Sequence, residues 1–99
     1  MKDYMNLKQI RVSYFYLIRG RNGMVREDFN FFKETLRELL DEIFEKHGED
    51  SLRARCWDPR KNCLAPGIAL FVNSRKVIDL AHKLKNGDEV FLTPLLSGG

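Results

Sequence analysis

An amphipathic segment at residues 35–47 is the sequence feature that most limits the fold. Its apolar residues recur at helical spacing and form one face: Leu36, Leu39, Leu40, Ile43 and Phe44. Thr35 followed three residues later by Glu38 is a capping box, and Gly48 stands where a left-handed cap ends a helix. A chain of 99 residues is long enough for one sheet and the helix that covers it.

The other regular segments have the composition of short strands. Residues 9–19 alternate, with one parity occupied by Ile10, Val12, Tyr14, Tyr16 and Ile18. Residues 20–23 contain two glycines around Asn22 and predict a turn, after which 24–31 is the second strand of a hairpin. Further strands are predicted at 67–72, 76–78 and 89–93, with turns at 73–75 and 86–88. We predict one α+β domain over residues 1–99, with an N-terminal extension at 1–8 and a flexible C-terminal tail at 94–99.

Composition excludes several classes of protein. Hydrophobic residues make up 43% and charged residues 31%, which excludes disorder by composition. No apolar run approaches the roughly 20 residues of a membrane span, and the first residues lack a secretory signal, so we expect a cytoplasmic protein without membrane contact. The net charge is +3, and the densest basic stretches, residues 53–55 with 60–61 and residues 75–76, are interpreted as solvated surface. A small nucleic-acid-binding module is the lowest-ranked alternative.

The sequence lacks the usual catalytic and metal-binding motifs. It has no Gly-x-Ser-x-Gly, no glycine loop for phosphate and no pair of histidines at ligand spacing. Cys56 and Cys63 are six residues apart and no second pair completes a metal site, so we predict two free thiols, with a disulfide as the alternative. No metal and no bound cofactor are predicted. Residues 51–66 match no motif.

Two glycines, Gly98 and Gly99, end the sequence. At a glycine frequency of about 7%, such an ending arises by chance in roughly one chain in 200, and a frayed terminus or a cloning remnant is the simple explanation. Because glycine has no Cβ, however, such a tail can pass through a channel too narrow for other residues. A carboxylate delivered in this way can be activated by ATP as an acyl-adenylate and attacked by a sulfur or nitrogen nucleophile. The protein would then be a co-substrate, with the catalytic power in its partner.

The last part of the sequence has an ordered pattern: Asn86-Gly-Asp-Glu-Val90, a predicted short strand, Pro94 and the final Gly98-Gly99. Three segments precede it in order: Ile10–Phe15, Thr35–Leu40 and Phe71–Asn73. This set resembles the ending, the opening strand, the helix start and the end of a central strand in the sulfur-carrier family. That family includes the molybdopterin synthase small subunit (MoaD), the thiamine sulfur carrier (ThiS) and archaeal ubiquitin-like modifiers. The segment Thr93–Ser97 departs from the usual MoaD ending, which leaves the sulfur acceptor open.

The resemblance implies a ubiquitin-like β-grasp fold, a mixed four- to five-stranded sheet with one main helix packed on one face. It implies that Gly99 is adenylated by a ubiquitin-activating-like adenylyltransferase, which uses ATP, and then carries a thiocarboxylate. The first expected role is the small subunit of molybdopterin synthase in molybdenum cofactor biosynthesis, with the large subunit as partner. The alternatives are conjugation to lysines of target proteins, or sulfur donation to thiamine or transfer RNA. In each case the chain is not catalytic by itself.

Side-chain alternation predicts a partner-binding surface near the tail. If the helix covers Ile10, Val12 and Tyr14, then Phe15 points to the opposite face. The same argument places Phe71 and Phe91 on that face. Exposed aromatic clusters often mark binding surfaces. We therefore predict that Phe15, Phe71 and Phe91 dock a partner, together with Leu95 and Leu96 of the tail.

Overall fold

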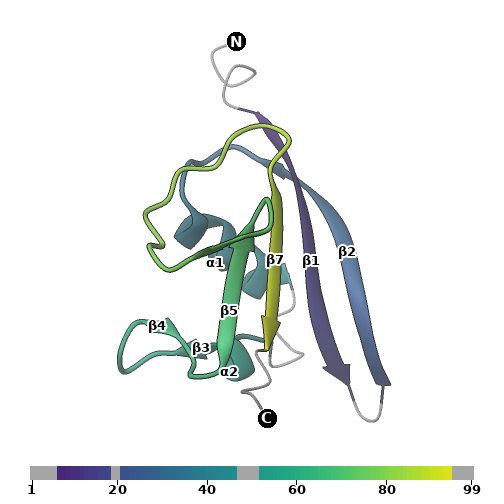
Figure 1. The fold of residues 1–99 in the computed structure, drawn as a ribbon, viewed down its shortest axis with the longest axis vertical. Helices are drawn as coiled ribbons and strands as arrows, with labels where there is room; N and C mark the ends of the chain where they lie inside the picture. The colour runs from purple at the N-terminus through teal and green to yellow at the C-terminus, as the bar shows by residue number, and fades with distance from the viewer. Residues whose placement is uncertain (1–6, 19–20, 47–51, 95–99) are drawn as a thin grey trace.

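A computed structural model describes residues 7–18, 21–46 and 52–94. Its main sheet has five strands in the order β2-β1-β7-β5-β6, and a second sheet is a small β3–β4 hairpin (Figure 1). The elements in chain order are β1 (Lys8–Ile18), β2 (Arg21–Phe31), α1 (Leu36–Lys46), α2 (Leu52–Cys56), β3 (Trp57–Asp58), β4 (Cys63–Leu64), β5 (Ile68–Val72), β6 (Arg75–Val77) and β7 (Glu89–Pro94).

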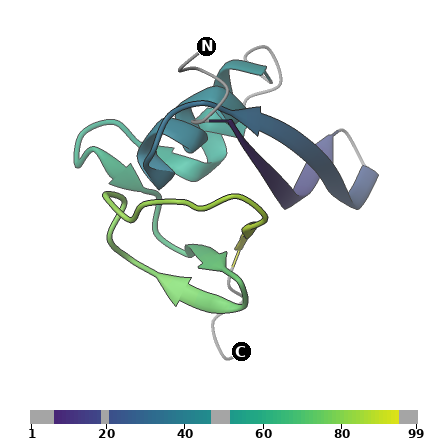
Figure 2. The ribbon, with the colours of Figure 1, turned by 90° about the horizontal axis from the view of Figure 1, so that it is seen from above.

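The main sheet is mixed. β1 pairs antiparallel with β2 and parallel with β7, while β5 pairs antiparallel with both β7 and β6. Helix α1 lies across one face of this sheet, as the view from above shows (Figure 2). The strand order and the single main helix are those of the expected β-grasp fold, which is confirmed.

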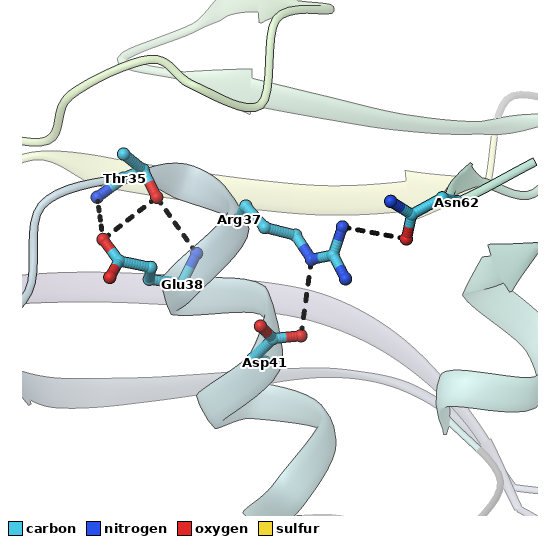
Figure 3. Close-up of polar contacts among 5 residues, drawn as sticks. All are labelled: Thr35, Arg37, Glu38, Asp41 and Asn62. Carbon is cyan, nitrogen blue, oxygen red and sulfur yellow. Dashed lines mark hydrogen bonds and ion pairs between the residues drawn. The ribbon is translucent and has the colours of Figure 1, made fainter. Parts of the chain in front are cut away.

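The predicted start of the helix is also confirmed. The Thr35 hydroxyl accepts a hydrogen bond from the Glu38 amide at 3.2 Å, and a Glu38 carboxylate oxygen accepts one from the Thr35 amide at 3.0 Å (Figure 3). The same oxygen accepts the Glu34 amide at 3.1 Å. These bonds to backbone amides lower the pKa of the Glu38 carboxyl from its usual value of 4.5.

The core lies between α1 and the sheet. All five apolar residues predicted for the helix face are buried, and they pack against inward-facing residues of the strands: Ile10, Val12, Tyr14, Leu70, Val72, Val90 and Leu92. Tyr14 is fully buried, yet its hydroxyl donates to the Glu27 carboxylate at 2.7 Å. Lys46, in the last turn of α1, pairs with the other Glu27 oxygen at 3.0 Å. The helix end is therefore joined to the β1–β2 hairpin by a polar contact as well as by packing.

Two parts of the sequence prediction need correction. The turn predicted at residues 20–23 is placed too late, because Arg21 pairs with Ile18 and Gly23 pairs with Tyr16 inside the hairpin. The strand predicted at 76–78 begins one residue earlier, at Arg75, and Ile78 lies beyond it, exposed. The turn before β6 is correctly located, with positive φ at Asn73 and Ser74. In the hairpin, cross-strand pairing of long strands outweighs the local turn preference of glycine.

Residues 52–64, for which the sequence showed no period, form α2, β3 and β4. Leu52 and Cys56 are buried in the core, and the Trp57 ring lies 6.3 Å from that of Phe44. These elements are too short for a periodic pattern, and contacts with the main core hold them in place. No helix in residues 7–18, 21–46 or 52–94 is long and apolar enough to cross a membrane.

Candidate functional site

The tail predicted to carry the chemistry follows β7. This strand lies between β1 and β5, and Val90 and Leu92 on its inner side are buried. Its last residue, Pro94, is still in register with Ile68 at the start of β5. The predicted site residues Leu95, Leu96, Gly98 and Gly99 lie outside the described residues. The sheet therefore fixes the point from which the tail starts.

The opposite end of β7 is fastened by Asn73 in the β5–β6 turn. The Asn73 amide donates to the Glu89 carbonyl at 2.8 Å, and the Asn73 side-chain oxygen accepts from the Glu89 amide at 3.0 Å. The Asn73 side-chain nitrogen donates to the Asp88 carboxylate at 2.9 Å. This explains why an asparagine follows the central strand: its side chain holds β5 and β7 in register at the end remote from the tail.

Two of the three predicted aromatic residues meet on the sheet face opposite α1. Phe71 and Phe91 are direct partners between β5 and β7, and their ring centroids are 6.3 Å apart at an interplanar angle of 38°. Both side chains are half-buried. Phe15 lies in β1, where its backbone pairs with Met24, but its side chain is outside the described part of the structure. The docking role of this face stays a prediction.

Strand β2 contributes side chains to the same face, and the sequence analysis did not predict them. Met24 is 50% exposed, and Arg26 is paired in register with Ser13, which in turn neighbours Phe91. A hollow of about 410 Å³ opens here, lined by Ser13, Met24, Arg26, Phe71, Ser74, Glu89, Val90 and Phe91. The alternation of side chains along β2 could have placed Met24 and Arg26 on this face, but only if the register of the hairpin had been predicted correctly. The face combines an apolar centre with charged margins.

The two cysteines are free and differ in burial. Cys56 is buried, which raises the pKa of its thiol to about 11, whereas Cys63 is half-buried. The Cys63 thiol donates to the Leu64 carbonyl at 3.4 Å. Within the described ranges, no three His, Cys, Asp or Glu side chains gather in a way that could hold a metal ion.

Comparisons with known proteins agree with this architecture. The family model described as the ThiS family matches residues 21–99. The crystal structure of SAMP1 from Haloferax volcanii is similar at 24% identity, with a TM-score of 0.67 over 92% of this chain and 99% of that one. SAMP1, the small archaeal modifier protein 1, from Methanosarcina acetivorans is similar at 19% identity, with a TM-score of 0.62 over 94% of this chain and 98% of that one.

A eukaryotic structure has the same fold. Urm1 from Trypanosoma brucei is 22% identical, with a TM-score of 0.57 over 95% of this chain and 98% of that one. No curated protein matches the sequence. The structural matches establish the β-grasp fold, and the family model covers most of the sequence, including both final glycines. The chain therefore belongs to the ThiS family and has the β-grasp fold.

Proposed function

We propose that this protein is a sulfur carrier that reacts through the carboxylate of Gly99. The observation that carries the proposal is the extent of the family match, which runs through Gly98 and Gly99. The carboxylate attacks the α-phosphate of ATP in the activating enzyme, giving an acyl-adenylate and releasing pyrophosphate. A persulfide on a sulfur-donor protein then displaces AMP and gives an acyl disulfide. A second thiol attacks the donor's sulfur, forms a disulfide there and releases the thiocarboxylate.

The fold contributes by delivering the carboxylate. β7 is paired with β1 as far as Leu92 and with β5 as far as Pro94, and five residues follow it. Five extended residues span at most about 17 Å, so the reacting site of any partner must come within that distance of Pro94. Gly98 and Gly99 add no side chains to the last part of this path. The partner must therefore contact the surface of the protein around the start of the tail.

The proposed sulfur acceptor is a precursor of the molybdenum cofactor, with the chain as the small subunit of a molybdopterin synthase. In that assembly the face formed by Phe71 and Phe91 docks the large subunit, while the tail enters its active site. The two rings are half-buried and adjacent, so their side chains lose little further conformational entropy when a partner covers them. Leu95 and Leu96 lie between this face and the glycines in sequence and are proposed to bind the same partner.

Conjugation to proteins is the second candidate function. It is favoured by the structural similarity to two proteins named SAMP1, of which one is described as a small archaeal modifier protein. The activation step is the same, but a lysine amine of the target, rather than a sulfur nucleophile, attacks the activated carboxyl group. The bond formed is then an isopeptide between Gly99 and the lysine.

One experiment separates both of these functions, which share the activation step, from a protein that only binds. The source organism's adenylating enzyme is assayed for ATP–pyrophosphate exchange with the wild-type chain, a chain lacking Gly98 and Gly99, and S97A as the matched tail control. We expect exchange with wild type and S97A and none with the deletion, while all three unfold at the same urea concentration. Exchange by the deleted chain would refute the proposal.

The acceptor is then identified from cells. Lys85 is the last basic residue of the sequence, so trypsin leaves residues 86–99 attached to a target lysine if the chain is a modifier. Detection of that branched peptide supports conjugation. Restoration of molybdopterin synthesis by the wild-type chain, but not the deletion, in cells lacking their own small subunit supports the carrier role. Failure of this restoration would refute the proposed acceptor.

A further inference from the structure

Residues 52–66 form an exposed basic surface that the proposed chemistry does not use. We call these residues the basic segment; they include α2 and the β3–β4 hairpin. Four of its side chains are cationic and one, Asp58, is acidic. Arg53, Arg55, Arg60 and Lys61 are all exposed. Glu49 and Asp50, which precede the segment in sequence, lie outside the described residues.

The basic segment is fixed to the core. Leu52 and Cys56 are buried. The Trp57 ring lies 6.3 Å from the Phe44 ring, and the guanidinium carbon of Arg37 lies 4.4 Å from the Trp57 ring centroid. The Arg37 guanidinium also donates to the Asn62 side-chain oxygen at 3.1 Å, in the turn between β3 and β4 (Figure 3). The cations are therefore presented from an ordered support, which lowers the entropy lost when a partner binds.

Within the residues that the structure describes, no ion pair neutralises Arg55, Arg60 or Lys61. The one carboxylate of the segment, that of Asp58, accepts hydrogen bonds from the backbone amides of Arg60 at 3.0 Å and Lys61 at 3.3 Å. It therefore stabilises the turn and is directed at the backbone, while the cationic side chains remain available to an external anionic group.

The basic segment lies at the end of the molecule from which the tail starts. Its last residues lead directly into Ile68, which is paired with Pro94. Figure 1 shows α2, β3 and β4 at the same end of the long axis as the end of β7. Because the tail spans at most about 17 Å, a protein that takes Gly99 into its active site must approach this end of the molecule.

We propose that the basic segment docks an acidic surface of the activating enzyme beside the channel that receives the tail. This inference rests on the proposed function. Opposite charges speed diffusional encounter and suppress wrong partners, and they act before the tail is engaged. Arg55, Arg60 and Lys61 supply the positive surface.

The structure favours a protein partner over a nucleic acid. Single-stranded nucleic acid is commonly bound by stacking bases on aromatic rings beside basic residues. The one tryptophan here is half-buried and already has the Arg37 guanidinium over its ring at 4.4 Å, which leaves less of the ring for stacking a base. The exposed part of the segment is charged, as expected for a surface that meets carboxylates of another protein.

The test is a charge reversal with a matched control. The variant R55E/R60E/K61E is compared with R75E/K83E/K85E. The control makes the same change in net charge with exposed residues at the start of β6 and in the loop before β7, at the other end of that strand. Both are assayed for ATP–pyrophosphate exchange with the source organism's adenylating enzyme, at about 50 mM and about 500 mM salt. Urea unfolding checks that each variant is folded.

We expect reversal in the basic segment to lower kcat/KM about 10-fold or more at low salt, through KM, with kcat unchanged. The loss should shrink at high salt, where charges are screened beyond a few Å. The control should stay within about twofold of wild type. Equal losses of kcat/KM in both variants, or no loss in R55E/R60E/K61E, would overturn the docking proposal. The proposed function would still stand in that case, provided that wild type supports exchange.

Two further outcomes complete the test. If the wild-type chain supports no exchange, the docking proposal and the proposed function both fail. If wild type binds transfer RNA in a gel-shift assay, and R55E/R60E/K61E abolishes that binding but leaves exchange unchanged, the surface is a nucleic-acid surface and the docking proposal is wrong.

Discussion

The hydrogen bond between Tyr14 and Glu27 allows a quantitative test of how the helix end is joined to the hairpin. Substituting Tyr14 by Phe removes one hydroxyl and keeps the ring in the core. The hydroxyl is fully buried and lies 2.7 Å from a carboxylate oxygen, so it belongs to the stronger class of hydrogen bonds, those to charged groups.

Bonds of this class contribute about 1.5 to 3 kcal/mol. The Glu27 side chain is 18% exposed and retains Lys46 at 3.0 Å, so water and the ammonium group offset part of the loss. We therefore expect Y14F to lower the free energy of unfolding by about 1.5 kcal/mol. For a domain of this size that is a fall in Tm of roughly 6 to 12 °C.

Urea unfolding followed by circular dichroism measures the change, with the slope m checked for constancy. The double-mutant cycle with E27Q isolates the coupling between the two side chains. A loss below about 0.5 kcal/mol, together with a coupling near zero, would refute the assignment of a stabilising role to this contact.

Three other properties can be tested on the isolated protein. The pKa of Glu38 is lowered on folding, so its carboxylate stabilises the protein above pH 4.5, and that stabilisation is lost as the pH falls through the folded pKa. The difference in free energy of unfolding between wild type and E38Q should therefore be larger at pH 7 than at about pH 3. A difference that does not change with pH would contradict the capping role. Alkylation at neutral pH, followed by mass spectrometry, should modify Cys63 first and Cys56 only on unfolding, since burial raises the pKa of the Cys56 thiol to about 11; equal rates would contradict the burial of Cys56. R37A should shift the fluorescence of Trp57 to longer wavelength and lower stability by about 1 kcal/mol, and an unchanged spectrum would show that the stacked guanidinium does not shield the indole.

Local signals predicted the helix well because its determinants are close together in sequence. The capping box needs only residues 35–38, and the apolar face is set by spacing alone. The predicted position of the hairpin turn was wrong because the glycines at 20 and 23 are compatible with several turn positions. The pairing of Ile18 with Arg21 depends on contacts along the full length of both strands.

Elements that depend on distant contacts could not be predicted. The basic segment has no period, and α2 and the short hairpin are held by contacts of Leu52, Cys56 and Trp57 with the core. For the candidate site, alternation within each of two strands was enough to place Phe71 of β5 and Phe91 of β7 on the face opposite the helix. Met24 was missed because its place beside them depends on the register between β1 and β2.

The central claim is that the Gly99 carboxyl group is the reacting group of the protein. Its most direct test is the intact mass of the chain isolated from the source organism under conditions that preserve thioacids. We predict a chain ending at Gly99, of which a fraction has the mass gain for replacement of one carboxyl oxygen by sulfur, located on the C-terminal peptide. A native chain that extends past Gly99 without being trimmed there, or one that never carries sulfur or an isopeptide at Gly99, would contradict the claim.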